Sequence, residues 1–174
     1  PKIFMQKPSS YCPAILSLDK DTLQRLYTDN FYGFPIESDD ELFERLILEI
    51  NQAGLSWETI LKKQKNFQKA YRNFDIKKVA SFKEKDIDRL MNDAGIIRNR
   101  LKINAAIENA KVILGIQKEF GSFKKWIDHH HPKTKEEWVK IFKNTFRFTG
   151  GEIVNEFLMS TGYLAGAHIE SCHT

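Results

Sequence analysis

The sequence has few of the residues on which small secreted domains depend. Its 174 residues include two cysteines, five prolines and nine glycines. The two cysteines, Cys12 and Cys172, lie near opposite ends of the chain, which argues against the disulfide framework of a small secreted protein. We therefore expect reduced thiols and a cytoplasmic protein.

Long apolar runs are also absent. No stretch approaches the roughly 20 apolar residues of a membrane helix, and the opening PKIFMQKPSSYCPAIL lacks the apolar core of a signal peptide. We expect no membrane association.

Neither sign of charge dominates strongly, because 27 Lys and Arg against 23 Asp and Glu give a net charge of +4. This mild excess is compatible with a polyanionic partner. The length suits one domain with a sizeable core, and we predict a single domain over residues 1–174.

Strand patterns are missing as well. No segment shows sustained period-two alternation, whereas apolar residues recur at helical spacing along most of the chain. Ser38 with Glu41, and Thr134 with Glu137, form capping-box patterns at helix starts. The sequence thus predicts an all-α fold, with helices that begin after Ser38, after Ser56, around Val79, at 86–91, at 100–120, after Thr134 and near Gly151.

A carboxylate stands beside the apolar stripe of the helix that ends at Gly54. Steps of four, three and four residues join Leu42, Leu46, Glu49 and Ala53, which places Glu49 at the edge of the buried face. Its head could reach water from that margin. Alternatively, Glu49 is a partly desolvated carboxylate at the mouth of a pocket, where it can accept hydrogen bonds or attract a cation.

The segment 88–102, DRLMNDAGIIRNRLK, predicts two helices joined by a short link at Gly95. Glycine there tolerates a positive φ and lets another backbone approach closely. The following helix start, with Arg98, Arg100 and Lys102, suits a phosphate. An ordinary helical hairpin with a solvated basic start explains the pattern equally well.

Other chemical motifs are weak. His129, His130 and His131 precede Pro132 and predict a solvated loop rather than a metal site. Glu152 and Glu156 lie one turn apart at the start of the last helix, where we expect them to complement the positive helix end.

Several segments together resemble the 3-methyladenine DNA glycosylase I family. They are LEINQAGLSWETILKKQKNF, FDIKKVA and DIDRLMNDAGIIRNRLKINAAIENA, followed by FRFTGGEI and AHIESC. The resemblance implies a helix-hairpin-helix DNA glycosylase-like helical bundle, with the helix-hairpin-helix at about 86–111 and the two ends of the chain packed together. It also implies base excision repair, in which the protein flips 3-methyladenine out of double-stranded DNA and hydrolyses its N-glycosidic bond.

The resemblance further implies roles for single residues. Glu49 would be the carboxylate that hydrogen-bonds the flipped base, Trp57 would stack on the base, and Tyr27 would line the opposite wall. Gly54 and Leu55 match the loop that approaches the gap left in the duplex. The residues that would hold the phosphate backbone are Gly95, Ile97 and Arg98. The implied enzyme is monofunctional, monomeric and free of any cofactor for its chemistry.

The structural zinc site of that family is incomplete here. The resemblance implies ligands at Cys12, His168 and Cys172, but Thr28 stands where the family has a histidine. A threonine hydroxyl is a poor zinc ligand, so we expect no tightly bound zinc unless His173 substitutes.

The N-terminal aromatics also depart from the family. Ala14, Gln24 and Tyr32 stand where the family has tryptophan, tyrosine and tryptophan, and the stretch 131–146 is shorter than usual. These departures leave an alternative open, a non-catalytic helix-hairpin-helix DNA-binding protein that has lost excision. The presence of Glu49, Tyr27 and Trp57 favours the enzyme.

Overall fold

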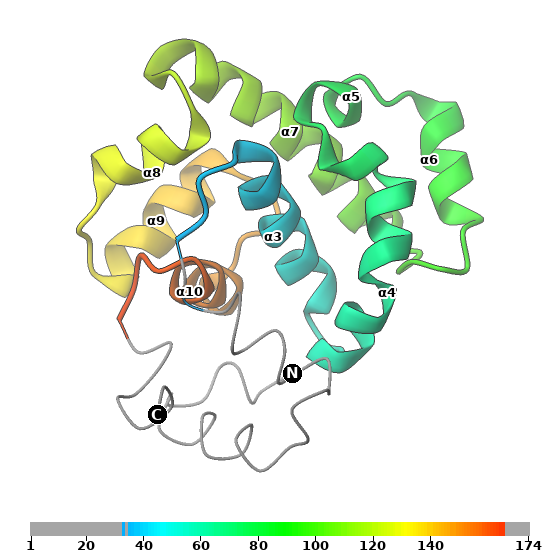
Figure 1. The fold of residues 1–174 in the computed structure, drawn as a ribbon, viewed down its shortest axis with the longest axis horizontal. Helices are drawn as coiled ribbons and strands as arrows, with labels where there is room; N and C mark the ends of the chain where they lie inside the picture. Colours follow the sequence, from blue (N-terminus) through cyan, green and yellow to red (C-terminus); the bar gives the residue numbers. More distant parts are fainter. Residues whose placement is uncertain (1–32, 34, 166–174) are drawn as a thin grey trace.

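The computed structural model describes residue 33 and residues 35–165, and this part of the chain is built from helices without any strand (Figure 1). The all-α prediction is confirmed. In chain order the helices are α3 (Asp39–Gln52), α4 (Trp57–Ala70), the short 3-10 helix η1 (Arg72–Phe74), α5 (Ile76–Ala80), α6 (Glu84–Met91), α7 (Arg100–Phe120), α8 (Phe123–His130), α9 (Lys135–Thr145) and α10 (Gly151–Ser160).

Side chains cap the helices where the sequence predicts. Ser38 Oγ accepts a hydrogen bond from the Glu41 amide at 3.4 Å. Thr134 and Glu137 form the complete reciprocal box, because Thr134 Oγ1 accepts from the Glu137 amide at 3.2 Å and the Glu137 carboxylate accepts from the Thr134 amide at 3.0 Å. Each bond satisfies an amide that the first helical turn leaves unpaired. Local sequence therefore fixes these helix starts.

Helix α3 lies in the middle of the molecule, and α4, α7, α8 and α10 pack around it (Figure 1). Ten of its 14 residues are buried. The buried polar residues among them are Arg45, Glu49, Asn51 and Gln52. A helix buried on most of its circumference must give every such group a partner or a function, since an unsatisfied buried polar group is costly.

Asp39 anchors the start of α3 to the corner between α7 and α8. Its carboxylate accepts from the Gln117 side chain at 2.8 Å and from the amides of Phe123 and Lys124 at 2.8 and 3.0 Å. The negative charge also complements the positive end of both α3 and α8. One side chain thus fixes the orientation of α3.

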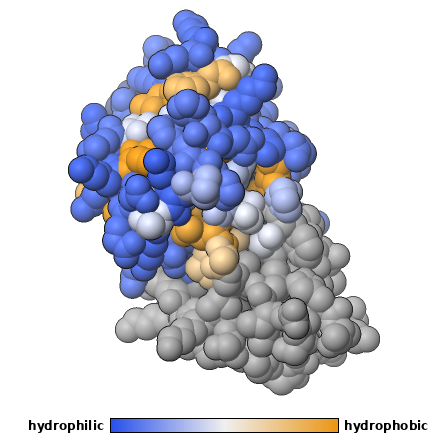
Figure 2. Space-filling model, turned by 90° about the vertical axis from the view of Figure 1, so that its left-hand side faces the viewer, coloured by the Kyte–Doolittle hydropathy of each residue, from blue (hydrophilic) through white to orange (hydrophobic). Residues whose placement is uncertain are grey.

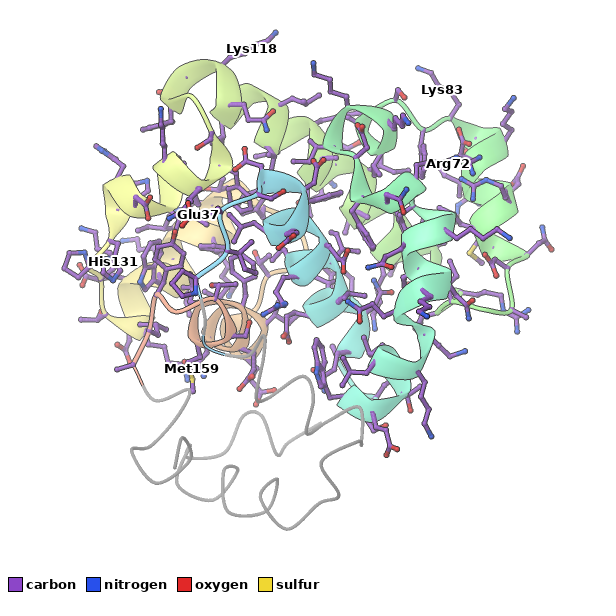
Figure 3. The ribbon with its side chains drawn as sticks, viewed as in Figure 1. Glu37, Arg72, Lys83, Lys118, His131 and Met159 are labelled. Atoms are coloured by element: carbon purple, nitrogen blue, oxygen red, sulfur yellow. The ribbon has the colours of Figure 1, made fainter. Side chains whose placement is uncertain are left out.

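The turn after α4 is a feature that the sequence did not predict. Arg72, Asn73 and Phe74 all have positive φ, between 53° and 57°. The unusual backbone turns the Phe74 ring inward, where it stacks on Tyr71 at 5.3 Å and meets the Phe43 edge at 6.0 Å. Arg72 stays at the surface between α4 and α6 (Figure 3). Burial of one aromatic ring compensates the strain of the left-handed conformation.

The histidine run is partly helical, which corrects the prediction of a solvated loop. His129 and His130 form the last turn of α8, and His131 follows as its C-cap. The His130 ring contacts Trp126 at 5.0 Å, and burial lowers the pKa of His130 below its usual value. The pattern Phe123, Trp126, Ile127 has helical spacing and carries α8 into the core.

The coloured part of the face in Figure 2, which belongs to the described residues, is mostly hydrophilic with small separate apolar areas. In residues 35–165 only Leu101 and Phe148 are large, exposed apolar side chains. No helix among the described residues is long and apolar enough to cross a membrane.

Candidate functional site

Glu49 is buried near the end of α3. Its side chain is 3% exposed, which excludes the interpretation of a carboxylate that reaches bulk water. Burial raises the pKa of Glu49 from 4.5 to about 8, although the nearby positive charge of Arg45 acts in the opposite direction. A carboxylate in this position responds strongly to any cation brought beside it.

Trp57 begins the next helix and faces the interior. The indole is 2% exposed. Ser56 fixes the start of α4, because its hydroxyl accepts from the Thr59 amide at 3.1 Å. The predicted start of this helix after Ser56 is confirmed.

The turn between α3 and α4 is held rigidly. Gly54 has a φ of 82°, a conformation that only glycine adopts freely. Gln52 binds both main-chain polar groups of Leu55. Its main-chain carbonyl accepts from the Leu55 amide at 2.7 Å, and its side-chain amide donates to the Leu55 carbonyl at 2.9 Å. Leu55 is half-buried on this turn. Sequence reasoning missed the role of Gln52.

The link between α6 and α7 is compact, but not through a left-handed glycine. The φ of Gly95 is not positive. Space favours glycine here instead, because a Cβ at this position would lie 3.0 Å from Asn66 Cγ of α4 and the Asn66 side chain would have to shift. The Gly95 amide donates to the Asp93 carboxylate at 2.8 Å, so that amide already has a partner. Its neighbour Ile97 is half-buried.

The three predicted cations after the hairpin point in different directions. Arg98 is exposed and forms no ion pair with a described residue. Arg100 pairs with Glu84 of α6. Lys102 turns inward, and its ammonium donates to the carbonyls of Asn51 and Ala53 at the end of α3. Among these three, Arg98 is the exposed cation without an ion pair to a described residue, and it is therefore the candidate for a phosphate contact.

The described residues bring four of the predicted site positions together along one stretch of backbone. Glu49 lies in the last turn of α3, Gly54 and Leu55 form the turn that follows, and Trp57 begins α4. The hairpin positions Gly95, Ile97 and Arg98 belong to the α6–α7 link, which Lys102 connects to this turn. The two helices therefore place a buried carboxylate and a buried indole on either side of a rigid turn.

The remaining predicted positions lie outside the described residues. They are Tyr27, the zinc candidates Cys12, Thr28, His168, Cys172 and His173, and the replaced aromatics Ala14, Gln24 and Tyr32. Within residues 35–165 no group of three His, Cys, Asp or Glu side chains is arranged to hold a metal ion. The predicted donor set itself does not fit a four-ligand zinc site, because it includes a neutral threonine hydroxyl.

Glu156 differs from its prediction. It lies in α10 and is 1% exposed, whereas Glu152 in the first turn is exposed. Only Glu152 fits the expected role of complementing the helix start.

Comparisons with known proteins identify a family. A family model described as methyladenine glycosylase matches residues 17–143. The chain is 34% identical to DNA-3-methyladenine glycosylase 1 of Escherichia coli, over 89% of this chain and 92% of that protein. It is 35% identical to the DNA-3-methyladenine glycosylase of Haemophilus influenzae, over 84% and 89%.

Solved structures give the same answer. The structure of 3-methyladenine DNA glycosylase I from Staphylococcus aureus superposes with a TM-score of 0.79 at 32% identity, over 87% of this chain and 91% of that chain. A variant of 3-methyladenine DNA glycosylase I in complex with 3-methyladenine gives a TM-score of 0.80 at 30% identity, over 87% and 92%.

Proposed function

The chain belongs to the methyladenine glycosylase family, and we therefore propose that it is a monofunctional DNA glycosylase that releases 3-methyladenine from double-stranded DNA. The observation that carries the proposal is the burial of Glu49 and of Trp57 on the two sides of the turn at Gly54. We propose that one helical domain over residues 1–174 performs the reaction.

The chemistry needs few protein groups. Methylation at N3 leaves adenine positively charged, so the base already departs readily. The bond from C1′ to the base breaks with its electron pair going to the base, and the sugar develops oxocarbenium character. Water then forms the new C1′–O bond and loses a proton. The protein must mainly extrude the base and favour the cation over normal adenine.

We assign base recognition to Glu49 and Trp57. A cationic base beside Glu49 lowers the pKa of its carboxyl from about 8 and favours the carboxylate, which then attracts the base. The indole face attracts the same cation through its π electrons. Both interactions strengthen when water is excluded. Tyr27 is proposed as the opposite wall.

We assign DNA positioning to the turn and the hairpin. Leu55 would enter the space that the flipped base leaves, and Gly54 would let the turn approach the duplex. Gly95, Ile97 and Arg98 would hold the phosphate backbone. Phosphate contacts fix the register of the protein on DNA without reading sequence.

Three further proposals complete this description. We propose that the protein is a monomer, since among residues 35–165 only Leu101 and Phe148 are large, exposed apolar side chains. We propose the cytoplasm as its location, because its curated relatives are bacterial and the bacterial chromosome lies there. We propose that it needs no cofactor for its chemistry, because the methylated base is already a good leaving group.

The test is release of the free base. The protein is incubated with methylated duplex DNA, and the released bases are separated by chromatography. Wild type should release 3-methyladenine, and the matched variant Glu49→Gln should release far less. Absence of release by wild type above a buffer blank, with binding to duplex DNA intact, would instead support the non-catalytic DNA-binding protein that Ala14, Gln24 and Thr28 suggest.

A further inference from the structure

Lys102 connects the hairpin to the end of α3. It is the third residue of α7 and only 7% exposed, which is unusual for lysine. Its amide donates to the Asn99 side chain, the cap of α7, at 3.1 Å. Its ammonium donates to the carbonyls of Asn51 and Ala53, each at 3.3 Å. A single residue therefore bonds to the last residue of the hairpin and to the last turn of α3.

The end of α3 requires a cation from elsewhere. Its last turn has no basic residue of its own, and the last carbonyls of a helix lack internal partners and carry partial negative charge. Lys102 supplies this charge across the interface between α7 and α3. Burial lowers the pKa of Lys102 from 10.5, which is the expected cost of placing an ammonium here.

The same bonds lead on to Leu55. Lys102 fixes the carbonyls of Asn51 and Ala53, and Gln52 between them fixes both the amide and the carbonyl of Leu55. The path from the hairpin to Leu55 thus passes only through hydrogen bonds and short backbone segments. A displacement of the turn would therefore displace the Leu55 side chain, which is proposed to enter the duplex.

We propose that Lys102 is a positioning residue that holds Leu55 at a fixed place relative to the hairpin, so that Leu55 fills the duplex when the hairpin is seated on the phosphates. The proposal rests on the glycosylase function argued above. It assigns to Lys102 an action through Leu55 and no contact with the reacting atoms. Loss of the ammonium would leave two carbonyls unpaired and free the turn.

The experiment is a double-mutant cycle between Lys102→Met and Leu55→Ala. Lys102→Met keeps the length of the side chain and removes its donors. We expect it to lower the single-turnover excision rate about tenfold, as loss of about 1.4 kcal/mol of transition-state stabilisation would, with affinity for undamaged duplex changed less than about twofold. In the Leu55→Ala background, Lys102→Met should have almost no further effect. Lys102→Arg, which keeps a donor, should recover part of the rate.

The matched control is Asn109→Leu on the same helix. Asn109 is fully buried and also binds main chain, since its side chain donates to the Arg147 carbonyl at 3.0 Å and accepts from the Arg147 amide at 2.8 Å. It lies two turns beyond Lys102, and both of its hydrogen bonds go to Arg147 rather than to the Leu55 turn. The variant should lose thermal stability. Any factor by which it lowers the excision rate should be the same in the wild-type and the Leu55→Ala background.

A second readout separates this proposal from the proposed function. 2-Aminopurine placed beside a tetrahydrofuran abasic site reports unstacking of the duplex without any excision. Wild type should change its fluorescence, whereas Leu55→Ala and Lys102→Met should both change it less. Two results would overturn the positioning role. In one, the rate losses of Lys102→Met and Leu55→Ala simply multiply in the double variant. In the other, a folded Lys102→Met protein changes the fluorescence as much as wild type does. If Lys102→Met does not fold, Gln52→Met serves in the same cycle, because it removes a bond to Leu55 directly.

Discussion

The Glu49 carboxyl lies one helical turn beyond the Arg45 guanidinium on α3, and both side chains are buried. Glu49 is 3% and Arg45 9% exposed, and Arg45 Nη1 donates to the Ser160 carbonyl of α10 at 3.1 Å. The positive charge lowers the pKa of Glu49, but burial has the larger effect and raises it to about 8. Burial therefore favours the neutral acid form of Glu49 in the free protein.

This raised pKa predicts a stability that falls with pH. The native state holds a proton on Glu49 up to about pH 8, whereas the unfolded chain loses it near 4.5, so unfolding becomes easier as pH rises through this window. Each unit within the window can cost up to about 1.4 kcal/mol. Urea unfolding of wild type and Glu49→Gln at pH 5, 6.5 and 8 should show the variant gaining stability relative to wild type as pH increases. A constant difference between the two proteins would contradict the raised pKa.

Trp57→Ala should destabilise the fold as well as reduce excision. Removing a tryptophan that is 2% exposed leaves a large cavity, which typically costs about 3–5 kcal/mol. Thermal denaturation measures the cost. Trp57→Phe retains an aromatic face and should keep the fold, so its excision rate tests stacking more cleanly. Equal stability of the alanine variant and wild type would show that the indole packs less tightly than its exposure indicates.

Gly95→Ala should disturb the hairpin through Asn66. The added Cβ would lie 3.0 Å from Asn66 Cγ and 3.1 Å from Asn66 Cβ, which forces one of the two segments to move. We expect a cost of about 1 kcal/mol and weaker binding to every duplex, damaged or not. Asn66→Gly in the same protein should restore both properties. Gly54→Ala is the comparison, because no atom lies within 4 Å of its added Cβ and only the positive φ opposes it.

Arg98→Ala should weaken binding to all duplexes alike. Arg98 is exposed, and a phosphate contact made by it contributes about one unit to the salt dependence of the binding constant. Fluorescence anisotropy across a range of salt concentrations should show a shallower slope. Lys118→Ala, at the far end of α7, is the control and should leave the slope unchanged (Figure 3).

Purified protein should contain little zinc. Three plausible ligands, Cys12, His168 and Cys172, are accompanied by Thr28, whose hydroxyl binds zinc poorly. Elemental analysis of protein prepared without added metal is the measurement, and Thr28→His should raise the zinc content. One zinc per wild-type chain would show that another group, such as His173, completes the site.

Helix starts were predictable because their signals are local. Ser38 and Thr134 cap the helices that their own neighbours form, and the range 100–120 matches α7. Tertiary packing decided what the sequence could not. The left-handed turn at Arg72–Phe74 forms because the Phe74 ring packs into the core. The end of α8 was not predicted, because a run of three histidines is typical of a solvated loop.

In the candidate site, too, local features were predictable from the sequence and tertiary contacts were not. The spacing of Glu49 on its helix placed it beside the core, but only the surrounding helices decide whether it is buried. The inward turn of Lys102 could not be predicted, because its acceptors lie 49 and 51 residues away along the chain.

The contacts of Asp39 bear on the order in which the site forms during folding. The carboxylate that fixes the start of α3 binds groups 78, 84 and 85 residues further along the chain. Contacts at such separation form slowly, because a long loop must close first. During synthesis from the N-terminus, the helix that carries Glu49 is therefore complete well before its anchor has been made. We therefore expect the α3–α4 turn, the proposed base pocket, to be fixed in place late in folding, because a chain cut before α8 would lack two of the three groups that bind Asp39.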